Sequence, residues 1–143
     1  MPIKCEIVSQ DRQVFSGLAN MVLLPGVFGE MGILPNHAPL LTTLSFGIIT
    51  VVGKEERSYF TVAGGFAEVQ PDQVIVLADA AENVEEIDVQ RAEAAKMRAE
   101  NLLKEPQKGD AVDLAMLQNQ LRKSSLRLNA VKRYKYKGRS TPS

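Results

Sequence analysis

The chain has 143 residues, of which 45% are hydrophobic and 24% are charged, enough for one small domain with an appendage. Its single cysteine, Cys5, excludes an internal disulfide, and no N-terminal segment joins basic residues to a long apolar run. We therefore expect neither a secreted nor a membrane-spanning protein, and the cytoplasm is the expected compartment.

The charge is divided unevenly along the chain, although the formal net charge is zero. Residues 1–110 carry 9 Lys and Arg against 16 Asp and Glu, a net charge of −7, whereas residues 111–143 carry 8 against 1, a net charge of +7. The basic C-terminal part is therefore expected to meet an acidic partner.

The N-terminal half has the pattern of short β-strands. Ile3, Cys5 and Ile7 alternate with charged residues, which is the two-residue period of a half-buried strand. Further segments rich in β-branched and aromatic residues follow, separated by short turns, at Val14–Phe15, Asn20–Leu24, Gly47–Val52, Arg57–Val62, Phe66–Gln70 and Val74–Ala78. This pattern predicts an all-β sandwich or barrel.

Two glycine-containing segments interrupt these strands. Gly29–Leu41, which contains the only histidine, is predicted to be an ordered surface turn that carries a recognition edge. Gly64-Gly65 is interpreted as a bend or bulge, because no helix start follows it and no phosphate-binding P-loop pattern occurs in the chain.

From Asp88 onward the apolar residues recur every three or four positions, which predicts helices. The first helix is expected to begin at the N-cap Asp88, to end before Pro106 and to bury Ala92, Ala95, Ala99 and Leu102. The second is expected to start near Asp110, with an apolar stripe interrupted by Ser124 and formed by Leu114, Leu117, Leu121, Leu128 and Val131.

A short connection between the helices predicts an antiparallel hairpin. Buried alanine contributes one methyl group, about 0.8 kcal/mol, against roughly 1.5–3 kcal/mol for leucine, so an alanine-lined first helix would hold its partner close but weakly. The predicted organisation is an all-β sandwich in residues 1–84, a two-helix hairpin in residues 85–134 and a disordered tail in residues 135–143.

Four motifs together resemble the ε subunits of bacterial F-type ATP synthases. They are GEMGILPNHAPLLTTL from Gly29, AGGFAEV at 63–69, VLAD at 76–79 and IDVQRA at 87–92. The resemblance extends from Met1 to about Lys132, and the first two motifs together are specific for the family. It implies a ten-stranded β sandwich followed by a helical hairpin.

The resemblance also implies a non-catalytic rotor subunit of the central stalk that needs no cofactor. Its implied partners are the γ subunit, the c-subunit ring and the β and α subunits of the catalytic head. Its implied place is the cytoplasmic side of the bacterial inner membrane, held there peripherally through the complex. In this role it would couple the head to the c ring in proton-driven ATP synthesis and inhibit ATP hydrolysis through mobile C-terminal helices.

Three sets of residues follow from the resemblance. Glu30 and His37 would meet the c ring, against the alternative that Glu30 is an exposed turn charge and His37 caps its own loop. A basic face of the second helix would approach acidic segments of the β subunits. The alternative is that this face is only solvated. The basic face comprises Arg122, Lys123, Arg127, Lys132 and Arg133.

A regulatory ATP site is the third implication. Some members of the family bind ATP through an I-D-x-x-R-A motif. In this chain the motif follows Glu82, and cations on the second helix would complete the site. The matching residues are Glu82, Ile87, Asp88, Arg91, Ala92, Lys123 and Arg127. Lys123 departs from the expected arginine and offers no bidentate fork. The alternative is that Asp88 is only an N-cap and Arg91 an exposed helix residue, and both interpretations remain open.

Enzymatic and metal-binding functions find no support in the sequence. A Cys–His nucleophile would require Cys5, which lies on a predicted buried strand face, to meet His37 in a turn. One histidine is too few for a histidine-rich metal site. A nucleic-acid-binding module is the alternative function, based on the basic second helix with Tyr134 and Tyr136 among its lysines, but the N-terminal half has no basic face.

Overall fold

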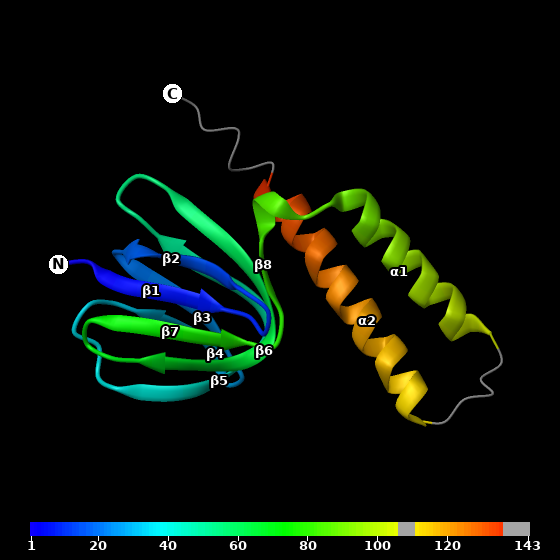
Figure 1. Ribbon diagram of the computed structural model, residues 1–143, viewed down its shortest axis with the longest axis horizontal. Coiled ribbons are helices and arrows are strands. Elements are labelled where there is room, and N and C mark those ends of the chain that lie inside the picture. The colour runs from blue at the N-terminus through cyan, green and yellow to red at the C-terminus, as the bar shows by residue number, and fades with distance from the viewer. Residues whose placement is uncertain (106–110, 136–143) are drawn as a thin grey trace. The chain divides into compact units, whose positions relative to one another are not determined.

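The computed structural model describes residues 1–105 and 111–135, apart from the side chains of residues 111 and 112. The chain divides into two compact units, Met1–Glu85 and a second unit from Glu86 onward. Figure 1 shows that the first unit consists of strands and the second of two long helices. This confirms the predicted fold class of a β sandwich followed by a helical hairpin.

The first unit contains eight strands. They are β1 (Ile3–Val8), β2 (Gln13–Ala19), β3 (Met21–Gly26), β4 (Gly29–Ile33), β5 (Leu40–Val52), β6 (Arg57–Val69), β7 (Gln73–Ala78) and β8 (Ala81–Asn83). The strand order is β2-β1-β7-β6-β5-β3-β4, and β8 pairs with β6. All pairs are antiparallel except β1 with β7.

The resemblance implied ten strands, and the described residues form eight. The difference lies in β5 and β6, which are 13 residues long and pair with each other along nearly their whole length. Gly64 and Gly65, with φ of +89° and +132°, bend β6 without ending it. Before the bend Phe60 and Val62 face the core, and after it Ala67 does, so the buried side of the strand changes at the glycines. The predicted bend is therefore confirmed, within one strand instead of between two.

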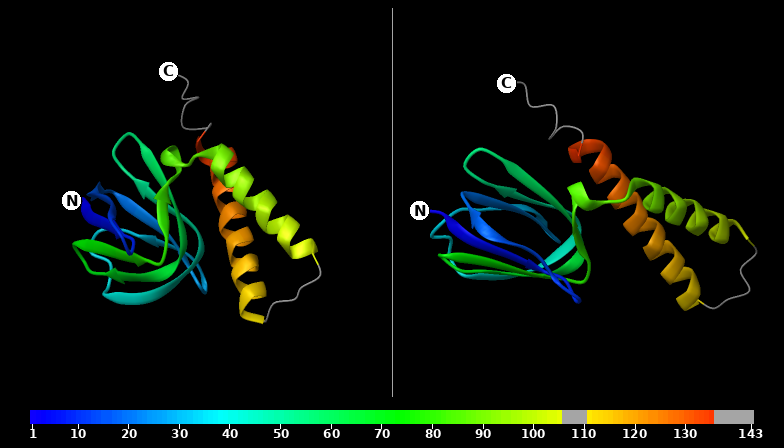
Figure 2. Two further views of the ribbon diagram at one scale, coloured as in Figure 1. Left: turned by 45° about the vertical axis from the view of Figure 1, so that its right-hand side comes forward. Right: turned by 45° about the horizontal axis from the view of Figure 1, so that its top comes forward.

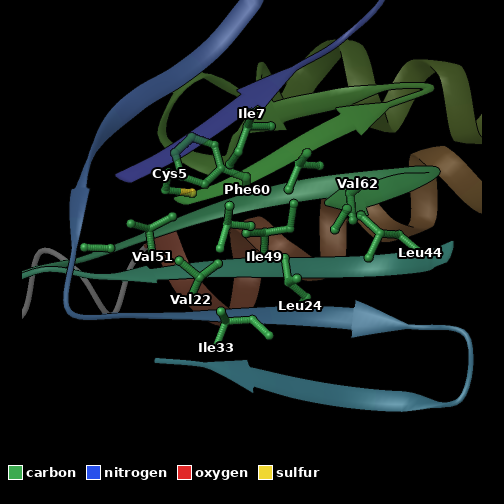
Figure 3. Packing of buried hydrophobic residues seen from close by; sticks show 14 of the residues in the cluster. Cys5, Ile7, Val22, Leu24, Ile33, Leu44, Ile49, Val51, Phe60 and Val62 are labelled. Atoms are coloured by element: carbon green, nitrogen blue, oxygen red, sulfur yellow. The ribbon is translucent and has the colours of Figure 1, made fainter. Parts of the chain in front are cut away.

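The core lies between the strands of the first unit. Alternate residues of β1, such as Cys5 and Ile7, are fully buried, as the two-residue period predicted. Figure 3 shows Ile7 and Phe60 pointing into the same interior as Val22 and Leu24 of β3. The rings of Phe15 and Phe60 pack with centroids 5.3 Å apart. Burial of these side chains from several strands stabilises the unit.

The prediction of a turn over Gly29–Leu41 was only partly right. Residues 29–33 form β4, an antiparallel partner of β3, and the turn is confined to the residues between β4 and β5. Two glycines had suggested a turn, but backbone pairing with β3 holds this segment extended. The short strand β8 and the 3₁₀ turn η1 (Val84–Glu86) were not predicted.

The second unit is a pair of antiparallel helices, α1 (Val89–Lys104) and α2 (Ala111–Ala130), which lie side by side in both views of Figure 2. Asp88 is the N-cap of α1, as predicted, and Glu105 follows its last turn in an extended conformation. The predicted connection around Pro106, Gly109 and Asp110 lies outside the described residues. A π-helical turn, η2 (Val131–Lys135), continues α2.

The predicted helix faces are confirmed with three corrections. Ala92 and Ala99 are buried, but Ala95 is only half-buried and Leu102 is 40% exposed. Ser124, expected to interrupt the apolar stripe of α2, is itself buried, because a small side chain suits closely packed helices. The first residue of the predicted disordered tail, Lys135, belongs to η2; residues 136–143 lie outside the described part of the chain.

Candidate functional site

An exposed apolar surface crosses the first unit. Val27 donates its backbone N–H to the Thr43 carbonyl at 3.1 Å, Thr43 pairs with Phe66, and Phe66 pairs with Leu77. Residues paired across neighbouring strands point to the same side of the sheet, so Thr43, Phe66 and Leu77 form one outward-facing row. Val27 lies in the turn after β3, and its backbone hydrogen bond joins that turn to the row at Thr43. Leu41, two residues before Thr43 on β5, lies on the same face.

We call Val27, Leu41, Phe66 and Leu77 the outer apolar patch. Their exposed fractions are 48%, 71%, 53% and 57%. Apolar side chains gathered on one sheet face typically mark a protein interaction site, whereas isolated ones need no explanation. The strand prediction missed this patch, although one signal was present. Both faces of β7 carry apolar residues in the sequence VIVLA, a pattern typical of strands covered on both sides.

The turn between β4 and β5 is built by backbone hydrogen bonds. Asn36 adopts a left-handed φ of +68° and donates its N–H to the Pro71 carbonyl at 2.7 Å, while the His37 N–H bonds the Leu34 carbonyl at 3.2 Å. Asparagine tolerates this conformation better than most residues. The turn is therefore ordered, as predicted.

His37 and Glu30 lie at different places on this edge. The His37 ring places Nδ1 2.8 Å from the Ala38 carbonyl oxygen, so the ring interacts with its own loop. Glu30 is an exposed residue near the start of β4, opposite Pro25 of β3. Glu30 and His37 thus flank β4 at opposite ends and are not brought together into one cluster.

The start of α1 carries the I-D-x-x-R-A motif. The Asp88 carboxylate accepts a hydrogen bond from the Arg91 backbone N–H at 3.2 Å, and the Arg91 side chain is exposed. Ile87 and Ala92 are buried and therefore pack instead of facing solvent. Only Asp88 and Arg91 of the motif present polar groups to a ligand.

The cations of α2 differ in exposure. Lys123 and Arg127, one helical turn apart, are half-buried, whereas Arg122, Lys132 and Arg133 are exposed. Because α1 and α2 are antiparallel, the C-terminal part of α2, which carries these cations, lies beside the start of α1. The structure thereby brings Asp88, Arg91 and the cations of α2 to one end of the hairpin. Glu82 lies on β8 of the first unit, and its backbone carbonyl accepts a hydrogen bond from the Thr61 hydroxyl at 3.4 Å.

The remaining chemistry-bearing groups form no reactive site in the described residues. Burial, with a smaller contribution from Glu6, raises the pKa of the Cys5 thiol to about 12, so the thiol is protonated and poorly nucleophilic. Within residues 1–105 and 111–135 no group of three or more His, Cys, Asp or Glu side chains is placed to hold a metal ion. Neither described helix combines the length and apolar character needed to cross a bilayer.

Comparison with known proteins accounts for both units. Residues 2–84 match the family described as ATP synthase, Delta/Epsilon chain, beta-sandwich domain, and residues 85–132 match its long alpha-helix domain. The chain belongs to the ATP synthase delta/epsilon chain family. The resemblance to ε subunits noted in the sequence is thereby confirmed, and the alternative of a nucleic-acid-binding module is not supported.

Relatives of this delta/epsilon chain cover most of its length. An ATP synthase epsilon chain of Dehalococcoides mccartyi is 54% identical over 99 residues, which are 68% of this chain and 70% of the relative. One from Acidithiobacillus ferridurans is 41% identical over 138 residues, 96% of each chain. A chain in a cryo-EM structure of the Euglena gracilis mitochondrial ATP synthase OSCP/F1/c-ring shares the fold, with a TM-score of 0.70 at 20% identity over 93% of this chain and 82% of that one.

Proposed function

We propose that this delta/epsilon chain is a non-catalytic subunit of the ATP synthase central stalk. In that role it couples the catalytic head to the c ring during proton-driven ATP synthesis and restrains wasteful ATP hydrolysis through its hairpin. Its proposed location is the cytoplasmic side of the bacterial inner membrane, where it is held peripherally by the complex. The observation that carries the proposal is the outer apolar patch on a chain that matches the family in both units.

The outer apolar patch supports assembly with the γ subunit. Burying the exposed parts of four large apolar side chains favours association, at roughly 25 cal/mol per Å² of apolar surface before the costs of binding are counted. Residues 1–85 carry 4 Lys and Arg against 10 Asp and Glu, a net charge of −6. The partner surface is therefore expected to have an apolar centre and a basic rim.

The edge formed by β4 and the following turn is the proposed contact with the c ring. Exposed Glu30 can accept hydrogen bonds, and the ordered turn holds His37 in a defined place. A rigid loop on a β scaffold loses little entropy on binding. The hydrogen bond between His37 and its own loop supports a positioning role for this ring, with Glu30 as the charged contact.

The hairpin is the proposed inhibitory element. Its second helix would insert toward acidic segments of the β subunits in the catalytic head, and Arg122, Lys132 and Arg133 would supply exposed positive charge. The alanine-lined face of α1 supports this motion, because a buried alanine contributes less apolar surface than a leucine and leaves the two helices more easily separated.

ATP is the proposed ligand of the closed hairpin. Asp88 and Glu82 would take the adenine side, and Arg91 with Lys123 and Arg127 the phosphates. A ligand that binds only the closed hairpin stabilises it by RT ln(1 + [L]/Kd). Low ATP would therefore release α2 toward inhibition, and high ATP would hold it closed.

Assembly of the purified complex tests this function. A charge placed in the outer apolar patch by Phe66→Asp should prevent incorporation of the chain, because a buried unpaired carboxylate is costly. Leu18→Asp is the matched control, since Leu18 is also exposed but lies on β2, three strand spacings or about 14 Å from β6. Normal incorporation of the Phe66→Asp chain, with its fold intact by circular dichroism, would contradict the proposal.

A further inference from the structure

The two ends of the hairpin are packed differently. Four side chains are fully buried at the end where α1 begins and α2 finishes: Ile87, Ala92, Ala130 and Val131. At the far end Leu102 and Met116 are 40% and 58% exposed. The apolar side chains are therefore buried more completely where the first and last residues of the hairpin meet.

A hydrogen bond from Lys135 joins the two chain segments at this end. The Lys135 ammonium Nζ donates to the backbone carbonyl oxygen of Ile87 at 3.2 Å and so joins residues 48 positions apart. Ile87 directly precedes the N-cap Asp88, so its carbonyl lies outside the helical hydrogen-bond pattern of α1. A buried residue's carbonyl needs a partner, and here a lysine supplies it.

The π-helical turn η2 determines where this lysine lies. In η2 the hydrogen bonds connect residues five apart instead of four, so the residues after Ala130 are rotated relative to their positions in an α-helix. Single π turns within helices are frequent at functional positions. Lys135 is the last residue of η2 and is half-buried, whereas Lys132 of the same turn is exposed.

We propose that Lys135 is the latch of the helical hairpin. Its ammonium ties the end of α2 to the residue before α1, and separation of the helices begins when this hydrogen bond breaks. The latch lies at the end of the hairpin whose apolar side chains are buried most completely. It is a property of the isolated chain and does not depend on the proposed inhibition of ATP hydrolysis.

Amide hydrogen exchange of the full chain, followed by NMR, tests the latch. Lys135→Met keeps the aliphatic stem and removes the donor, while Lys132→Met is the matched control on the same turn. Hydrogen bonds to charged groups are stronger than neutral ones, so the amides of α2 and the hydrogen-bonded amides of Arg91 and Ala92 should exchange on the order of tenfold faster in Lys135→Met. They should exchange at the wild-type rate in Lys132→Met.

Two further measurements distinguish a latch from a general role of Lys135 in packing. The carbonyl ¹³C resonance of Ile87 should shift in Lys135→Met and not in Lys132→Met, because only the first change removes its hydrogen-bond donor. Lys135→Arg, which keeps a cationic donor, should restore slow exchange. Equal exchange in the two methionine variants, or an unchanged Ile87 resonance, would overturn the proposal.

Discussion

Gly29 and Gly65 have almost the same φ angle in very different surroundings. Their φ values are +131° and +132°, a region that residues with a Cβ rarely adopt. A Cβ on Gly29 would meet no atom within 4 Å, whereas one on Gly65 would overlap the Leu77 carbonyl and lie 2.8 Å from the Ala78 Cα. Gly65 therefore satisfies two requirements, conformation and close approach of β7, and Gly29 only the first.

The pair predicts a graded loss of stability. Gly29→Ala should lower the free energy of unfolding by roughly 1–3 kcal/mol, the cost of the backbone conformation alone. Gly65→Ala should cost about 1–3 kcal/mol more, because the backbone of β7 must also move. Urea unfolding of both variants measures the difference. Equal losses would show that crowding at Gly65 is relieved without cost.

Cys5 predicts a pH dependence of stability. The pKa of its thiol is raised from 9.0 to about 12 in the folded protein. Between these two pKa values the folded state binds more protons than the unfolded state. The contribution of Cys5 to the free energy of unfolding is therefore complete below pH 9 and falls by about 1.4 kcal/mol per pH unit above it. Cys5→Val has a side chain of similar volume and no thiol, so the difference in free energy of unfolding between wild type and this variant removes the effect of tyrosine titration. If that difference stays constant between pH 9 and 11, the prediction is wrong.

At the scale of elements, the sequence pattern predicted the features that depend only on nearby residues. The alternation in β1 and the N-cap Asp88 were visible because each depends on neighbours within four residues. The strand β4 was not predicted, since its extended form depends on pairing with β3, and Gly29 and Gly32 gave a turn-like composition. The outer apolar patch and the Lys135 latch depend on side chains from distant segments. The apolar residues on both faces of β7 were the one local signal of the patch, and no local pattern indicated the latch.

Asp88 separates the capping role from the proposed ligand role. Asp88→Ser keeps a side-chain acceptor for the Arg91 N–H, so the stability of α1 should stay close to wild type, whereas Asp88→Ala should cost about 1 kcal/mol. If Asp88 also binds ATP, both variants should lose ATP affinity. Thermal melting and calorimetric titration with ATP, with and without Mg²⁺, measure the two effects separately.

The same titration examines the phosphate side. Arg91→Ala combined with Arg127→Ala should abolish the heat of ATP binding, because both guanidinium groups are assigned to the phosphates. Undiminished binding by this double variant, or by Asp88→Ser, would mean that the motif is structural. No heat and no amide NMR shifts from the wild-type chain at millimolar ATP would exclude the ligand.

At the scale of the whole molecule, the two units divide the proposed work. The first unit has the larger core and an exposed apolar patch suited to permanent assembly. The second has small buried residues on α1 and a hydrogen bond from Lys135 to Ile87 that joins its ends, which suits a part that opens and closes. The match of each unit to its own family domain agrees with this division.

The rate of ATP hydrolysis by the assembled complex tests this account most directly. A chain truncated after Gly109 keeps the first unit and α1 and loses the basic second helix, so it should assemble as the full chain does. If the second helix inhibits as proposed, hydrolysis should then rise severalfold, because the truncated chain lacks that helix and keeps the first unit. Complexes carrying the full chain and the truncated chain should be compared at equal occupancy. Full inhibition by the truncated chain would contradict the claim that the second helix restrains hydrolysis.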